Sequence, residues 1–265
     1  MRWAAAVLAS LSGAALADDR AVDVALVLAV DISLSMDAFE QRAQRDGYVA
    51  ALTHPAVLDA VSRGRLGRLA VAYVEWGGPW TQRVVVPWTV IETEADAAEM
   101  AAELAVSPYD ASRGTSISAA LRFAARLFDD APPAERRVID ISGDGPNNLG
   151  GPVLEARAEV LAQGIEINGL PLMLGEPDLV FSVPDLDIYY EECVIGGPTA
   201  FVIPVLDING FATAIRQKLV MEIAGLPAPA RAEADRERPV PASGRIDCLI
   251  GEKLYERWRR RMDWN

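Results

Sequence analysis

The chain has 265 residues, of which 51% are hydrophobic, so it can bury one substantial core. Its formal net charge is −13, and a surface this acidic repels nucleic acid and anionic lipid while it favours cations and basic partners. Because His54 is the single histidine, a His-rich zinc site is excluded, and a Ser-His-Asp hydrolase would depend on that one residue.

Residues 1–17 have the features of a secretory signal peptide. Arg2 precedes an apolar stretch from Ala4 to Leu16, and Ala15-Leu16-Ala17 is a small-x-small cleavage site. The segment contains no cysteine, so we do not expect a lipid-modified start. No later apolar run is long enough to span a membrane. We therefore expect an exported, soluble protein that is periplasmic or extracellular.

The first predicted strand is the apolar run Val24–Val30, which is typical of a strand buried on both faces of a parallel sheet. It ends at Asp31, and open α/β sheets bind ligands at the carboxyl ends of their strands. Asp31, Ser33 and Ser35 offer only oxygen ligands, which suit a hard cation such as Mg²⁺ rather than zinc or copper. The alternative is that Ser35 or Asp37 simply caps the next helix.

Strand and helix patterns alternate along the rest of the chain. We expect a helix from Phe39 to about Thr53, and an antiparallel hairpin that turns at Trp76–Trp80. The expected strands are 69–74, 83–91, 137–141, 165–172 and 200–205. The later helices are expected at 92–105, 117–128, 152–163, 185–193 and 211–223. Asp207 is the expected cap of the last helix. This alternation predicts an α/β fold with a doubly wound, mostly parallel sheet, one antiparallel edge strand, and helices on both faces.

Two later stretches add ligands of the same kind. Thr115 stands where a helical pattern begins, and Asp144 follows a predicted strand, so both lie at the ends of elements. Asp140 lies inside that strand, which is unusual for a buried position. It either supports the site from beneath through a hydrogen bond or merely faces a polar neighbour.

These three loops, D-x-S-x-S, G-T and an apolar strand ending in D-G, resemble the metal-ion-dependent adhesion site (MIDAS) of von Willebrand factor type A domains. Asp31, Ser33 and Ser35 match the first loop, Thr115 the second and Asp144 the third. In the third loop, Ser-Gly-Asp-Gly replaces the commoner Thr-Asp-Gly. The resemblance covers residues 23–225, and it is greater to a secreted bacterial family of such proteins than to animal adhesion receptors.

The resemblance implies a divalent cation, Mg²⁺ first and Mn²⁺ or Ca²⁺ as alternatives, that captures an Asp or Glu of a partner protein. The loops hold no general base, so we expect binding and not catalysis. One alternative is a metal-assisted hydrolase with Asp140 or Glu75 as its base. The other is a structural module in which the cation only pins the three loops together.

The chain changes character after the domain. Residues 226–244 contain four prolines and mixed charges, as in a linker, and residues 245–265 regain helical spacing. Cys193 and Cys248 are expected to form a disulfide in an oxidising compartment, the alternative being two unrelated buried thiols. The predicted parts are a signal peptide (1–17), a von Willebrand factor A-like domain (18–225), a linker (226–244) and a helical tail (245–265).

Overall fold

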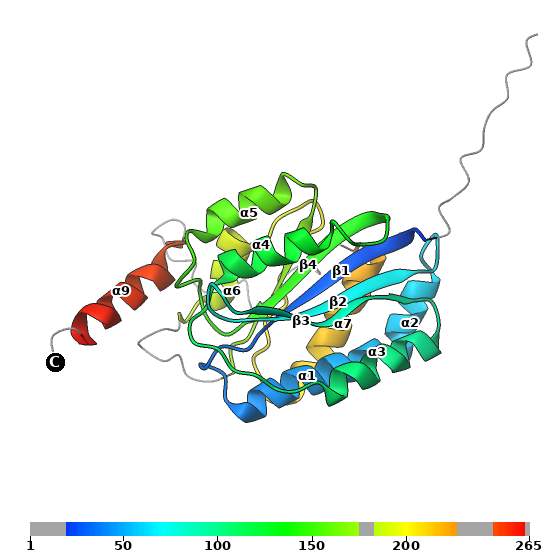
Figure 1. Ribbon diagram of the computed structural model, residues 1–265, viewed down its shortest axis with the longest axis horizontal. Coiled ribbons are helices and arrows are strands. Elements are labelled where there is room, and N and C mark those ends of the chain that lie inside the picture. The colour runs from blue at the N-terminus through cyan, green and yellow to red at the C-terminus, as the bar shows by residue number, and fades with distance from the viewer. Residues whose placement is uncertain (1–19, 175–182, 227–245, 263–265) are drawn as a thin grey trace, which may run out of the picture.

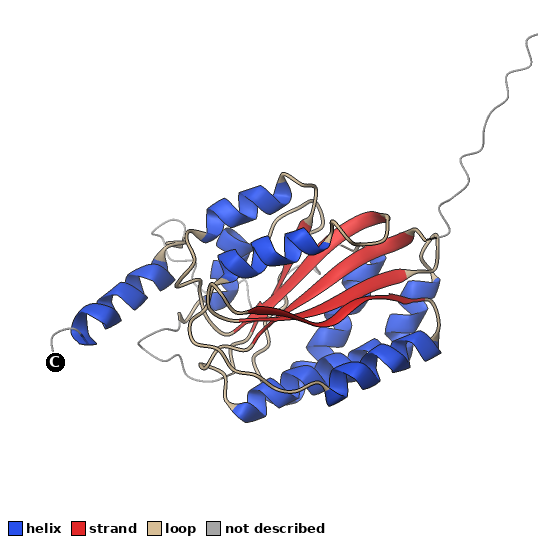
Figure 2. Ribbon diagram, in the orientation of Figure 1, coloured by secondary structure: helices blue, strands red, loops and turns tan. Residues whose placement is uncertain are grey.

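The computed structural model describes residues 20–174, 183–226 and 246–262, which form a five-stranded sheet with helices on both faces (Figures 1 and 2). The predicted signal peptide lies outside the described residues, as does the predicted linker except for Leu226. The domain boundaries therefore remain predictions. Among the helices that are described, none combines the length and hydropathy needed to cross a bilayer.

The strands lie in the order β3-β2-β1-β4-β5. The central strand β1 (Val22–Asp31) is buried at every residue and runs parallel to β2 (Leu69–Trp76) and β4 (Ala134–Gly143). Strand β5 (Glu166–Pro171) extends the sheet in parallel, and β3 (Gln82–Ile91) is the antiparallel edge. This arrangement confirms the predicted fold class.

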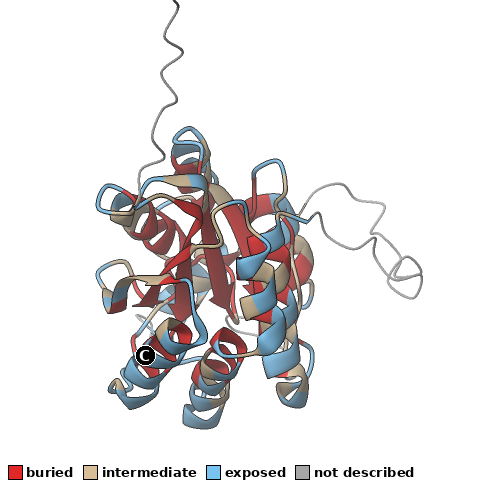
Figure 3. Cartoon of the chain, turned by 90° about the vertical axis from the view of Figure 1, so that its right-hand side faces the viewer, coloured by how far each residue is buried: buried red, intermediate tan, exposed pale blue. Residues whose placement is uncertain are grey.

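Two layers of helices bury the two faces of the sheet (Figures 1 and 3). Alternate residues of β1 serve opposite faces, because successive side chains in a strand point to opposite sides. Leu26 and Leu28 pack toward one layer, and Val27 and Ala29 pack toward the other. The first layer is α1 (Ala38–Leu52), α2 (Pro55–Ser62), α3 (Glu94–Val106) and α7 (Phe211–Ala224); the second is α4 (Ile117–Leu127), α5 (Val153–Leu161), α6 (Leu186–Tyr189) and the π-helical turn η1 (Tyr190–Val194).

Helix α2 was not expected from the sequence, where His54-Pro55 marks the end of a helix. Proline fits the first position of a helix because the N–H that it lacks has no partner there anyway. His54 caps the new helix, since its Nδ1 accepts from the backbone N–H of Ala56 at 3.1 Å. The dipeptide therefore ends one helix and begins the next.

The predicted strand at 200–205 is not a sixth strand of the sheet. Val202 and Val205 form only isolated bridges, to Gly169 and Leu172 respectively. Pro204 has no N–H to donate to a ladder, which is one physical reason why regular pairing does not develop. The segment leads to the short 3-10 helix η2 (Ile208–Gly210), where Asp207 acts as the cap, and then to α7.

The C-terminal tail contains helix α9 (Ile250–Met262), which projects from the body of the domain (Figure 1). The disulfide between Cys193 and Cys248 is present, with a Cα–Cα distance of 5.6 Å, and confirms the predicted pairing. The backbone N–H of Ile246 also donates to Glu192 at 2.8 Å. The start of the tail is thereby fixed to η1.

Candidate metal site

The first candidate loop begins where β1 ends. Asp31 is fully buried, and its Oδ1 accepts from the backbone N–H of Ser33 at 2.7 Å, which folds the loop back over the strand. The hydroxyl oxygens of Ser33 and Ser35 lie 2.8 Å apart. Asp37 caps α1 in a capping box with Glu40, so the cap expected at Ser35 or Asp37 belongs to Asp37. Ser35 is therefore free to face the site.

The third loop meets the first directly. The hydroxyl of Ser35 donates to Oδ1 of Asp144 at 2.8 Å. Gly143, the position without the expected hydroxyl, has no room for a side chain: a Cβ would lie 2.8 Å from Oδ2 of Asp31 and 2.9 Å from the hydroxyl of Tyr190. The departure from the commoner motif thus follows from the close packing beneath Asp31.

The second loop joins the first through the backbone. Ser112 donates its N–H to the carbonyl of Ile32 and accepts from the N–H of Leu34, both at 2.9 Å. These bonds place the segment that leads to Thr115 beside the first loop, and Thr115 itself is buried. The structure thus links Ser33, Ser35 and Asp144 through hydroxyl contacts, and backbone bonds of Ser112 hold the segment before Thr115 beside the first loop.

The chemistry of this donor set fits a hard cation. Oδ2 of Asp31 is buried and has no hydrogen-bond partner among the described residues. Burial, and then the nearby charge of Asp144, hold the pKa of Asp31 well above its ordinary value. Burial also raises the pKa of Asp144 to about 6, against the hydrogen bond from Ser35. A bound cation would favour the ionised form of both carboxylates, and oxygen donors alone suit Mg²⁺ or a similar ion.

Within the described ranges, no group of three or more His, Cys, Asp or Glu residues is placed so that it could hold a metal ion. The candidate site has two carboxylates and would rely on the hydroxyls of serine and threonine for its other contacts. This composition differs from that of a structural zinc site, which uses Cys and His.

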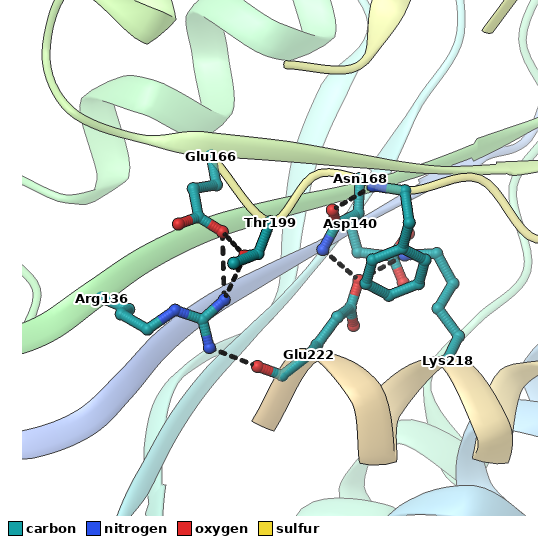
Figure 4. A network of polar contacts seen from close by, with 8 residues as sticks. Arg136, Asp140, Glu166, Asn168, Thr199, Lys218 and Glu222 are labelled. Atoms are coloured by element: carbon teal, nitrogen blue, oxygen red, sulfur yellow. Dashed lines mark hydrogen bonds and ion pairs between the residues drawn. The ribbon is translucent and has the colours of Figure 1, made fainter. Parts of the chain in front are cut away.

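The side chain of Asp140 points toward α7 (Figure 4). Its Oδ1 lies 2.8 Å from Nζ of Lys218, and both side chains are about 1% exposed. Lys218 also pairs with Glu222, whose Oε1 accepts from Asn168 at 3.0 Å. Asp140 thus has a charged neighbour, and its support of the metal site stays a prediction. Sequence reasoning missed this network because Asp140 and Asn168 are far in the chain from the Lys218–Glu222 pair of α7.

The buried network predicts a pH dependence of stability. Burial, and then the charge of Asp140, raise the pKa of Glu222 to about 7, while Lys218 acts in the opposite direction. Between the ordinary value of 4.5 and about 7, the folded state holds a proton that the unfolded state has lost. The free energy of unfolding should therefore fall as the pH rises from about 4.5 to about 7, by at most about 1.4 kcal/mol per pH unit from this group, and level off above that.

Glu222→Gln should flatten this part of the pH dependence, as measured by urea unfolding at several pH values between 5 and 8.5. The other buried carboxylates titrate in both proteins, so the difference between the two curves reports Glu222. Parallel curves for wild type and variant would contradict the assignment.

Glu75, the other candidate base, is also held in ion pairs. Its carboxylate pairs with Arg45, which is buried, and with Arg83 at 2.6 Å. The guanidinium of Arg45 also stacks on the ring of Tyr109 at 3.8 Å and donates to the carbonyl of Ser107. The carboxylate thus anchors the loop before Thr115. Nothing in the sequence around Arg45 signals that it is buried.

Many solved structures have a similar fold, and they include a pilus adhesin, a byssus protein and a von Willebrand factor type A protein. The pilus adhesin SpaC from Lactobacillus rhamnosus GG, in its open conformation, has a TM-score of 0.57 at 14% identity, over 76% of this chain and 30% of its own. Proximal thread matrix protein 1 from the mussel byssus, with a zinc-occupied MIDAS motif, has a TM-score of 0.58 at 14% identity, and the match covers 77% of this chain and 48% of that protein. A von Willebrand factor type A protein from Catenulispora acidiphila has a TM-score of 0.51 at 19% identity, and the match covers 76% of this chain and 43% of that protein.

These identities are low, so the three similarities show the fold alone, which is that of von Willebrand factor type A domains. This chain spans less than half the length of each of the three proteins. No curated protein matches it in sequence. A family model with the description "Protein of unknown function (DUF1194)" matches residues 21–227, a range that includes all five candidate ligands. The chain therefore belongs to this family.

Proposed function

We propose that this protein is an exported binding module that captures a carboxylate of a partner protein through a divalent cation. Asp31, Ser33, Ser35, Thr115 and Asp144 would hold the cation. The observation that carries the proposal is the buried Oδ2 of Asp31, which has no hydrogen-bond partner in the part of the chain that the structure describes and lies near the charge of Asp144. A bound cation would neutralise both groups, and Mg²⁺ retains waters that it exchanges for an incoming acid.

The surface around the site supports a protein as the partner. Leu34 lies between two of the candidate ligands and is 58% exposed, and Phe39 in the first turn of α1 is 61% exposed. Exposed apolar side chains beside a polar centre suit a protein surface, in which apolar contacts surround a few polar anchors. SpaC is named as an adhesin and the byssus protein as a thread matrix protein, which agrees with such a role.

The two alternatives make different predictions. A hydrolase needs a base, and the carboxylates of Glu75 and Asp140 are both engaged in buried ion pairs. A purely structural cation would require no partner. Capture of an exported protein by the immobilised domain in Mg²⁺, and its loss with chelator, would favour binding. Capture that is equal with chelator would contradict the proposal, and turnover on phosphate or ester substrates would favour the hydrolase.

Thr115→Ala should separate capture from simple scaffolding. The variant keeps both carboxylates, so the affinity for Mg²⁺ should fall only by the ~1 kcal/mol of one neutral oxygen contact. Capture of a partner should fall much further, because the hydroxyl helps to complete the coordination when an outside carboxylate arrives. If the cation only pinned the loops together, the loss of Mg²⁺ affinity and the loss of partner capture would be equal, because there would be no separate partner-bound state for the hydroxyl to stabilise.

The measurement pairs metal affinity by calorimetry with partner capture at saturating Mg²⁺. Thr53→Ala is the matched control, because Thr53 caps the far end of α1 and is exposed. Full capture by the Thr115→Ala variant would show that the bridging hypothesis is wrong.

A further inference from the structure

The second candidate loop, which contains Thr115, is supported by the residues that follow the third loop, which contains Asp144. Oδ1 of Asn148 accepts from the backbone N–H of Thr115 at 3.0 Å, and the N–H of Asn148 donates to the carbonyl of Thr115 at 2.9 Å. The N–H of Leu149 reaches the same carbonyl at 3.3 Å. The position of Thr115 therefore depends on the segment 147–149.

Asn147 holds that segment in place with four contacts, and it is fully buried. Its Oδ1 accepts from the backbone N–H of Ser118 in the first turn of α4 at 2.9 Å. Its Nδ2 donates to the carbonyl of Gly151 at 2.9 Å and to Oε1 of Glu252 at 2.7 Å. Its backbone N–H donates to the hydroxyl of Tyr189 at 3.2 Å. The Glu252 contact comes from the C-terminal tail, more than a hundred residues away in sequence.

The tail reaches this position because two features bring it close. The disulfide between Cys193 and Cys248 fixes the start of the tail, four residues before Glu252. Gly251 then lies against the loop so tightly that a Cβ would be 2.1 Å from the carbonyl oxygen of Asn147. A side chain at this position would push α9 away from the loop. The glycine thus allows the carboxylate of Glu252 to meet Nδ2.

We propose that Glu252 of the C-terminal helix is a positioning residue for the candidate metal site. It acts through Asn147, which fixes the segment 147–149 and so the backbone of Thr115. The tail is then a working part of the site and not only an appendage. This inference rests on the proposed function, because it assumes that Thr115 is a ligand.

The test compares two glutamates one helical turn apart. Glu252→Ala removes an acceptor from a buried amide, whereas Glu256→Ala changes an exposed residue whose partner is Arg260 on the same helix. Glu252→Ala should weaken Mg²⁺ binding roughly threefold, which is less than the loss of Thr115 itself. Glu252→Gln retains an acceptor oxygen and should restore the affinity. Glu256→Ala should have no effect.

A second measurement needs no metal. In the metal-free protein, amide hydrogen exchange followed by NMR should be faster at Thr115 and Ser118 in Glu252→Ala, by roughly tenfold, and unchanged in Glu256→Ala. A purely structural role of the tail would lower overall stability and speed exchange throughout the domain. Unchanged exchange at both amides would overturn the proposal.

A double-mutant cycle then shows the route of the effect. If Glu252 acts through Thr115, the double variant Glu252→Ala, Thr115→Ala should bind Mg²⁺ no more weakly than Thr115→Ala alone. Additive losses would overturn the proposed route. Failure of the proposed cation site is distinguishable, because the wild-type protein would then bind no Mg²⁺, and failure of partner capture alone would leave this effect on Mg²⁺ binding intact. Wild-type binding that Glu252→Ala leaves unchanged would contradict this inference alone.

Discussion

Asp31→Ala is expected to lower the affinity for Mg²⁺ by roughly tenfold or more, which corresponds to about 1.4 kcal/mol or more. The residue supplies the only carboxylate of the first loop, and its Oδ2 has no other partner among the described residues. Asp144 alone would leave the cation with one negative charge. Calorimetric titration with Mg²⁺, and with Mn²⁺ in parallel, measures the change.

The sheet should remain folded in this variant, because Asp31 lies at the end of β1 and the hydrogen bonds between the strands do not involve its side chain. Mg²⁺ should raise the melting temperature of the wild type but not that of the variant, since only a protein that binds the ion is stabilised by it. Asp59→Ala is the matched control, because Asp59 is an exposed residue of α2. Equal affinities for wild type and Asp31→Ala would exclude the proposed site.

The places of the candidate ligands in the fold could be predicted from the sequence, because each lies at or near the end of a regular element. Strand β1 is apolar along most of its length, so the position of Asp31 at its carboxyl end follows from the pattern. Thr115 and Asp144 are fixed in the same way, by the start of α4 and the end of β4. Parallel strands then bring these ends to one edge, which is a property of the fold and not of any pair of residues.

The supporting contacts were not predictable, because they join residues without a local signal. Arg45 lies on α1 between the polar residues Gln44 and Asp46, yet it is buried and paired with Glu75 on β2. The contact between Asn147 and Glu252 depends on a disulfide and on a glycine that only the packed structure explains. Periodicity reports which face of an element is buried, but not which polar groups meet inside.

The buried ion pairs beneath α7 lead to the largest expected change in stability. Lys218→Met should lower the free energy of unfolding by about 3–5 kcal/mol, because it leaves the carboxylates of Asp140 and Glu222 buried without their cation. Methionine matches the length of the lysine stem, so lost packing contributes little to the effect. The exposed Lys253→Met on α9 is the control and should change stability by less than about 0.5 kcal/mol.

The sign of the pH dependence distinguishes lost charge from lost packing. Without Lys218 the pKa values of both carboxylates rise further, so the folded variant loses stability more steeply than the wild type as the pH rises. Urea unfolding should therefore give a larger difference between wild type and Lys218→Met at pH 8 than at pH 5. Adding Glu222→Gln to the variant should recover part of the loss at pH 8, because one buried charge is then gone. A difference that is the same at both pH values would mean that Lys218 contributes by packing and not by its charge.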